Sequence, residues 1–434
     1  MTYSVLCSGA YGLEEMISVS GPGIAMLTLL VLPLIWAVPI GLVCAELTAR
    51  YPMEGGYYLW TRMAFGDFTG YLAGWLVWLA SFATNATFAV LFANYLRYWI
   101  PELPHVLHWA IATAVVWGTV YLNWRGIRFV GTASVILTCL LFLPFLFLTL
   151  LGFWHWRQNP LAPFVAPSTS PLTAFVASLN IGIWLYSGME KLTPNAGEVK
   201  NPSRAFPIAI ALGLLMSAGS YLIPTCAALA SHGHWSEWGE SYFSVAAQGL
   251  GGPILGGAMA AGALLSSIGL LMVTMLGQSR LPMVMAEDGL FPRAFARTHP
   301  RHGTPTVSLL FGGVVLSVLV LGKFSSLVAM FSLVQVTAYL LLFAALLQLR
   351  WRESRRDASV EVKPNVGFRI PMGISGLVLL SVPCLLLSSM VIIKSVWHKG
   401  VVDVQQALID ALVLASGPLS YFLLTQWRRR LARG

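Results

Sequence analysis

Charged residues are scarce in this chain: they make up 10% of its 434 residues, whereas hydrophobic residues make up 57%. So small a charged fraction cannot coat a soluble globule of this length, which indicates a membrane protein with many spans. Acidic residues are scarcer still than basic ones, 17 against 26, for a formal net charge of +9. The basic residues stand in short loops between apolar runs and form no cluster with stacking aromatics. Membrane topology explains the excess, and no nucleic acid is expected as a partner.

Cysteine and histidine are also few, with five cysteines and eight histidines. The cysteines stand singly in apolar segments without paired spacing, and the histidines lie in loops or at the ends of apolar runs. We therefore expect no disulfide framework, no structural metal site and no cofactor other than a coupling ion. No nucleophile stands beside a base, so we do not expect an enzyme. Residues 1–6 carry no basic leader, and no cleavable signal peptide is predicted.

Apolar runs of about twenty residues predict twelve membrane-spanning helices. Their approximate limits are 3–20, 24–50, 69–97, 107–123, 129–153, 172–191, 204–230, 247–281, 306–322, 325–348, 370–393 and 404–427. With a cytoplasmic N-terminus, nearly all lysines and arginines fall in the inner loops. The outer loops then hold only Arg97, Arg157, Lys323, Lys394 and Lys399. This asymmetry predicts that both termini lie in the cytoplasm.

The first predicted span is interrupted by the sequence Cys7-Ser8-Gly9-Ala10-Tyr11-Gly12. Two glycines and a serine within six residues weaken a helix and let the backbone leave helical angles. Unwound backbone at membrane depth is tolerated only against protein or a water-filled cavity. The sixth predicted span carries a second interruption at Ser187-Gly188, and Gly188 follows Gly9 by 179 residues.

The second and seventh spans, and the third and eighth, recur at nearly the same offset as the two breaks. A repeat of five spans must insert twice with opposite orientation, as in many secondary transporters. We therefore divide the chain into repeat 1 (1–153, helices 1–5), repeat 2 (172–348, helices 6–10), two accessory helices (370–427) and a basic cytoplasmic tail (428–434). Either break alone would indicate close helix packing, but matching breaks in both halves favour a binding site.

Five motifs occur in order along these spans. They are Ser8-Gly9-Ala10-Tyr11-Gly12-Leu13-Glu14-Glu15, Ala45-Glu46-Leu47, Tyr51-Pro52 with Gly55-Gly56-Tyr57, Gly197-Glu198-Val199-Lys200-Asn201-Pro202, and Ala286-Glu287-Asp288-Gly289-Leu290-Phe291-Pro292. With them the chain resembles the amino acid, polyamine and organocation (APC) superfamily of permeases over nearly its whole length. The first three spans are most similar to polyamine-uptake transporters, and the region around helix 6 is similar to arginine and agmatine exchangers. The resemblance implies an all-α membrane protein of the leucine transporter (LeuT) type. That fold is a 5+5 inverted repeat with 12 transmembrane helices, of which helices 1 and 6 are discontinuous.

The two breaks supply the candidate binding site. Free amides of the first break, at the positive end of a half-helix, suit a carboxylate, and carbonyls of the second suit an ammonium. The resemblance further implies that Trp184 covers the substrate and that Asn85 contacts it, although Asn85 could equally bond a neighbouring helix. The predicted substrate-binding residues are Cys7, Ser8, Gly9, Ala10, Asn85, Ile183, Trp184, Tyr186, Ser187 and Gly188.

Two acidic residues near the breaks, Glu14 and Glu190, are candidates for gating or proton coupling, because a carboxyl group at low dielectric can change protonation with movement. Glu190 could instead pair with Lys191. Ser266 and Ser267 are candidate sodium ligands by the resemblance, or they bond carbonyls of their own helix. The coupling ion, Na+ or H+, is left open.

We predict a secondary active transporter that moves amino acids across the cell (plasma or inner) membrane by alternating access, as symporter or exchanger. The polyamine-uptake relatives carry an acidic residue at the position of Thr84, and its loss here favours amino acids. Glu14 and Glu15 keep polyamine or organic-cation uptake as the alternative. A non-transporting membrane partner subunit is a remote third reading. The expected partners are a small-molecule substrate and the lipid bilayer, and the oligomeric state is left open.

Overall fold

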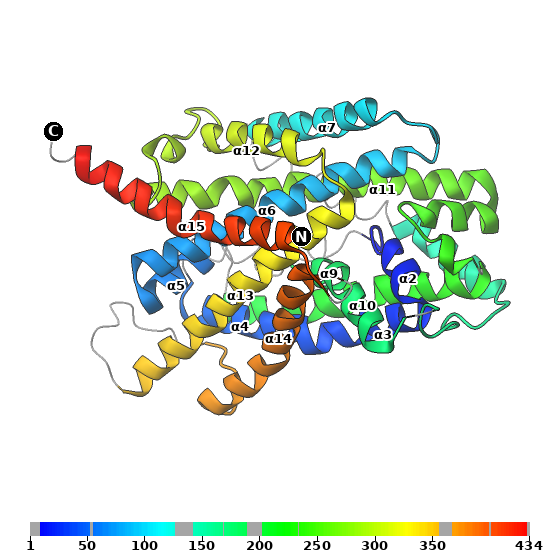
Figure 1. Ribbon diagram of the computed structural model, residues 1–434, viewed down its shortest axis with the longest axis horizontal. Helices are drawn as coiled ribbons and strands as arrows, with labels where there is room; N and C mark the ends of the chain where they lie inside the picture. Colours follow the sequence, from blue (N-terminus) through cyan, green and yellow to red (C-terminus); the bar gives the residue numbers. More distant parts are fainter. Residues whose placement is uncertain are drawn as a thin grey trace.

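The computed structural model describes residues 9–52, 55–125, 142–167, 169–188, 202–232, 234–355, 367–398 and 401–431 (Figure 1). In this part of the chain, eight helices are long and apolar enough to cross a membrane. They are Pro22–Arg50, which comprises α3 (Pro22–Leu32), η1 (Pro33–Ala37) and α4 (Val38–Arg50), and α6 (Asp67–Leu96), α7 (His105–Arg125), α10 (Pro202–Ser231), α11 (Tyr242–Glu287), α13 (Phe324–Ser354), α14 (Gly373–Val396) and α15 (Val404–Leu431). All eight coincide with predicted spans.

Shorter helices occupy the other four predicted spans. They are α2 (Glu14–Ser20), Phe142–Trp154, α9 (Pro171–Leu185) and α12 (Thr306–Leu319). A helix needs about 20 residues to cross the hydrocarbon core, and none of these four reaches that length within the described residues. The count of twelve spans, the inverted repeat and the domain limits therefore stay predictions.

The helix of the second predicted span changes its winding where prolines interrupt it. Pro33 begins a five-residue π-helical turn, and the amide of Val38 bonds to the carbonyl of Pro33, five residues back. Proline has no amide hydrogen, so Pro33 and Pro39 cannot complete the α-helical ladder there. The π-turn lets the chain continue as one rod from α3 to α4.

The helices α6, α11 and α13 form the centre of the molecule. Helix α6 packs along both α11 and α13, and Figure 1 shows α6 and α11 running side by side. Within the most apolar window of α6, 78% of the residues are buried, against 11% in α15. Because α15 buries so little, most of its apolar surface is left for the bilayer, whereas α6 is positioned to line a site inside the protein.

Several elements were not predicted. A nine-residue helix, α5 (Tyr57–Phe65), follows the second span, and short 3₁₀ turns stand at η3 (Trp235–Glu237) and η4 (Arg293–Ala296). The two-residue strands β1 (Trp397–His398) and β2 (Val401–Val402) pair between α14 and α15. Helix α11 is kinked where Gly251 and Gly252 leave helical angles. These elements lie in or beside loops, where hydropathy carries no signal.

Candidate functional site

The backbone of the first break leaves helical geometry at Gly9 (φ 98°) and Gly12 (φ 87°), and α2 begins only at Glu14. Glycine adopts such left-handed angles at no steric cost. Gly12 N–H is already bonded, because it donates to Oε2 of Glu14 at 2.7 Å. Cys7 and Ser8, two of the predicted contacts, lie outside the described residues, so what precedes the break stays a prediction.

The second break begins where α9 ends, at Leu185, and Gly188 takes a φ of 122°. The hydroxyl of Ser187 donates to the carbonyl of Ile183 at 2.6 Å. The carbonyl of Leu185 accepts a hydrogen bond from Tyr221 on α10 at 3.1 Å. Two of the carbonyls at this helix end are therefore occupied by the protein's own hydroxyl groups, which the sequence analysis did not foresee.

Two further predicted residues belong to the second break. The hydroxyl of Tyr186 donates to the carbonyl of Leu29 on α3 at 2.7 Å, which ties the side chain to that helix. Glu190 lies outside the described residues. Its role, like the discontinuity of helix 6, stays a prediction.

Helix α9 is held in place by three neighbouring helices. Ser178 shares a 2.8 Å hydrogen bond with Thr28 on α3, and the hydroxyl of Ser332 on α13 donates to an α9 carbonyl at 3.0 Å. The ammonium of Lys394 on α14 donates to two further carbonyls, at 3.0 and 3.1 Å. These bonds fix the helix end that carries Trp184.

The two breaks meet at Gly12 and Trp184. A Cβ atom on Gly12 would lie 3.0 Å from Cζ3 of Trp184 and 3.0 Å from Cζ of Phe324, so any larger residue would collide with both rings. The ring centroid of Trp184 lies 5.7 Å from that of Phe88 and 5.5 Å from that of Phe324. The structure therefore brings the indole of the second break onto the backbone of the first, and the covering of a substrate by Trp184 stays a prediction.

Glu14 is the acidic residue of this region, and its side chain is only 1% exposed. Besides the amide of Gly12, its carboxylate accepts a hydrogen bond from the hydroxyl of Tyr95 on α6. The ring centroid of Tyr11 lies 5.2 Å from that of Tyr95 and 4.8 Å from that of Phe145. A buried carboxylate thus stands at the first break, surrounded by aromatic rings.

Asn85 does not point free into a cavity. Its amide group donates to Gln278 on α11, and its carbonyl oxygen accepts a hydrogen bond from the hydroxyl of Thr274 on the same helix. These contacts match the helix-to-helix bonding that the sequence analysis gave as the equal alternative. Contact between Asn85 and substrate stays a prediction.

Ser266 and Ser267 are both buried on α11. The hydroxyl of Ser267 donates to the carbonyl of Ala263 at 2.8 Å, the intrahelical bond named as the alternative to sodium ligation. The break contacts α11 nearer its start, where the hydroxyl of Tyr11 donates to the carbonyl of Met259 at 3.0 Å. Sodium ligation by the two serines stays a prediction.

A second acidic group, Glu240, lies beside Glu15 in the loop before α11. Burial, and then the nearby carboxyl of Glu15, raise the pKa of Glu240 from 4.5 to about 7, and Arg97 opposes the shift. This group was not predicted as part of a site. Glu240 is therefore a carboxyl group beside helix α2 that changes charge near neutral pH.

Sequence reasoning missed the aromatic residues of the site: Tyr11, Phe88, Tyr95, Phe145 and Phe324. A signal was available for two of them. Phe88 and Tyr95 follow Asn85 by three and ten residues, which places all three on one side of a helix with 3.6 residues per turn. In a chain so rich in aromatics, that pattern alone does not stand out.

Comparison with known proteins places this arrangement in a family. The family model for amino acid permeases matches residues 1–413. The chain belongs to the amino acid permease family, within the APC superfamily. Together with its eight long apolar helices, this makes the permease an integral membrane protein and assigns it to a family of transporters.

The permease is similar to several plant proteins along most of their length. A probable polyamine transporter of Arabidopsis thaliana is 30% identical over 422 residues, which cover 93% of this chain and 80% of the relative. A polyamine transporter of Oryza sativa subsp. japonica is 31% identical over 409 residues, 91% of this chain and 72% of the relative. An uncharacterized transporter of Legionella pneumophila is 28% identical over 366 residues.

Proposed function

We propose that this permease is a secondary carrier for polyamines and related small organic amines, which it moves across the cell membrane by alternating access. The observation that carries the proposal is the place of Glu14. Its carboxylate accepts a hydrogen bond from the Gly12 amide of the first break. An amino acid substrate was predicted to place its own carboxylate in the same region.

A substrate carboxylate at this break would face the carboxylate of Glu14 in a buried setting, where like charges repel strongly. A substrate ammonium would instead find an anion there. Within the described residues, no lysine, arginine or histidine lies within ion-pair distance of Glu14 to neutralise it. The site is therefore better suited to an amine than to an amino acid.

The aromatic rings support the same choice. Trp184, Phe88 and Phe324 form one group at the break, and Tyr11, Tyr95 and Phe145 form another. An ammonium over the face of such rings gains about 0.5–2 kcal/mol, more as water is excluded. A diamine substrate could place one ammonium group near Glu14 and the other against an aromatic ring.

The relatives point to the same substrate class, because several of those similar to this chain are named as polyamine transporters. The absence of an acidic residue at Thr84, which favoured amino acids from sequence alone, weighs less once Glu14 supplies a buried carboxylate at the first break.

The test is competition in proteoliposomes between amines that differ by a single carboxylate. Putrescine and ornithine form one matched pair, and agmatine and arginine form the other. We expect each amine to inhibit uptake of labelled putrescine at a concentration about tenfold or more below that of its amino acid partner, since a like charge in a buried site costs more than 1.4 kcal/mol. Equal or stronger inhibition by ornithine and arginine would contradict the proposal.

Amino acid transport is the second candidate, and it is favoured by the description of the matching family. It requires a substrate carboxylate on the amides before Gly12, with Glu14 protonated. Uptake of labelled leucine that putrescine does not inhibit would establish it. Coupling to H+ through Glu14 or to Na+ at Ser266 and Ser267 is part of the proposal, and replacing Na+ by choline separates the two.

A further inference from the structure

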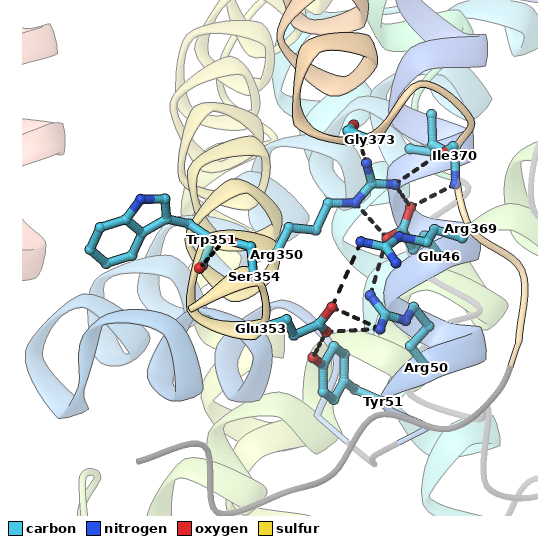
Figure 2. Close-up of polar contacts among 10 residues, drawn as sticks. All are labelled: Glu46, Arg50, Tyr51, Arg350, Trp351, Glu353, Ser354, Arg369, Ile370 and Gly373. Carbon is cyan, nitrogen blue, oxygen red and sulfur yellow. Dashed lines mark hydrogen bonds and ion pairs between the residues drawn. The ribbon is translucent and has the colours of Figure 1, made fainter. Parts of the chain in front are cut away.

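Five charged side chains alternate in sign where α4 and α13 end (Figure 2). In order of contact they are Arg350, Glu46, Arg50, Glu353 and Arg369. Glu46 and Arg50 belong to α4, Arg350 and Glu353 to α13, and Arg369 to the segment that leads into α14. The chain of charges therefore joins helices from both predicted repeats to an accessory helix, on the side predicted to be cytoplasmic.

Glu46 and Arg350, the buried pair, have no exposed surface. Arg350 Nε donates to Glu46 Oε1 at 2.8 Å, and its Nη2 donates to Glu46 Oε2. The backbone completes the network. The amide of Ile370 donates to Glu46 Oε2 at 2.8 Å, its carbonyl accepts from Arg350 Nη2 at 2.9 Å, and the carbonyl of Gly373 accepts from Arg350 Nη1.

Arg50 and Glu353, the surface pair, are built differently. Arg50 Nη2 donates to Glu353 Oε2 at 2.9 Å, and the two side chains are 10% and 16% exposed. The hydroxyl of Tyr51 donates to Glu353 Oε1 at 2.7 Å. Burial, and then Glu353, raise the pKa of Tyr51, so its hydroxyl keeps the proton that it donates. Arg369 approaches Glu353 only to 3.9 Å.

The two pairs differ in what their separation would cost. Parting Glu46 from Arg350 would strand two charges without water, which is strongly destabilising. Parting Arg50 from Glu353 would cost less, because these two side chains are 10% and 16% exposed and each is in partial contact with water. Arg50 Nη1 would still lie near Glu46 Oε1, 3.5 Å away, so its charge keeps a partner.

We propose that the surface pair is a latch that opens and closes the cytoplasmic ends of α4 and α13 during transport, while the buried pair is the hinge about which they part. Only the role of the latch in transport depends on the proposed function. Its opening is a property of the protein that can be measured without substrate.

The test is hydrogen exchange on the purified full-length protein and its Glu353→Gln variant. We expect backbone amides in residues 47–52 and 350–355 to exchange about tenfold faster in the variant, because opening of the two helix ends no longer breaks a charged pair. Amides in residues 367–373, beside the hinge, are expected to keep the wild-type rate. The melting temperature is expected to stay within about 2 °C of the wild type.

Arg355→Gln is the matched control, because Arg355 lies two residues from Glu353 on the same helix end and stacks on Trp351 at 3.9 Å instead. It is expected to exchange like the wild type, because its side chain takes no part in the chain of charges. Wild-type exchange in Glu353→Gln overturns the latch, as does a melting temperature lowered as far as in Glu46→Gln. A latch that responds in a protein unable to transport putrescine would refute the proposed function alone.

Discussion

Two buried carboxylates in this protein have opposite surroundings. Glu46 meets the guanidinium of Arg350 in a bidentate pair, whereas Glu14 is met by the hydroxyl of Tyr95 and the amide of Gly12. A buried charge with a paired and hydrogen-bonded partner holds helices together. A buried carboxylate that has only neutral donors can take its counter-charge from a ligand. The comparison separates a carboxylate paired within the protein from one that we propose acts in transport.

The largest effect is expected for Glu46→Gln, which tests whether the Glu46–Arg350 pair stabilises the fold. It leaves the guanidinium of Arg350 buried without a counter-charge, and the free energy of unfolding is expected to fall by about 3–5 kcal/mol. Thermal unfolding of the purified protein measures this. The double variant Glu46→Leu/Arg350→Met removes both charges and is expected to regain most of the loss. Wild-type melting in Glu46→Gln would show that the pair adds nothing to stability.

Glu14→Gln is expected to behave in the opposite way. The amide oxygen can still accept from Tyr95 or Gly12, so the melting temperature should hold or rise. Binding of putrescine should weaken by about 2 kcal/mol, roughly thirtyfold, because a charged partner is lost. A thermal-shift titration with putrescine measures both effects in one experiment. Glu237→Gln, in the exposed η3 turn, is the control, and a Glu14→Gln protein that binds putrescine normally would contradict the assignment.

Trp184→Ala removes the ring that covers Gly12 and is expected to raise the half-saturating putrescine concentration about five- to thirtyfold, since the cation loses about 1–2 kcal/mol of attraction to the ring. Trp184→Phe keeps a ring face and should retain most of the affinity. Uptake in proteoliposomes distinguishes the two. An equal loss in both variants would point to packing against Phe88 and Phe324 rather than to contact with the substrate.

The smallest effect is expected at Glu240. Because its pKa is raised from 4.5 to about 7, the folded protein keeps a proton that the unfolded chain releases between these values. Stability should therefore fall as pH rises through that window. Putrescine uptake should rise about two- to threefold over the same range as outside pH increases, since the ionised carboxylate attracts cations. Glu240→Gln should flatten both profiles, and an uptake profile unchanged by this substitution would show that the charge of Glu240 does not affect putrescine uptake.

Much of the fold could be predicted because hydropathy is a local property. Each of the twelve predicted spans overlaps a helix within the described residues, and eight of these helices are long enough to cross a membrane. The described backbone leaves helical angles at Gly9 and Gly188 as expected. The kink of α11 at Gly251 and Gly252 and the amphipathic α5 were missed, since a window of twenty residues averages over such features.

Less of the candidate site could be predicted. Glu14 and Trp184 were named in advance, and the structure places both at the breaks. Asn85 was named too, but it bonds α11 through Gln278, and the partner of Glu14 was not foreseen. Tyr95 lies 81 residues from Glu14, and nothing in either local sequence points to the other.

The sequence by itself determined that this chain is a polytopic membrane protein and predicted two interrupted helices, because the length of apolar runs and the position of glycines act within a single segment. Only the tertiary structure decided which buried charges are matched: Glu46 pairs with Arg350 from 304 residues away, whereas Glu14 accepts hydrogen bonds from the hydroxyl of Tyr95 and from backbone amides that include Gly12. The rotation of each helix about its axis and its packing against distant helices set these contacts, and neither is encoded in hydropathy.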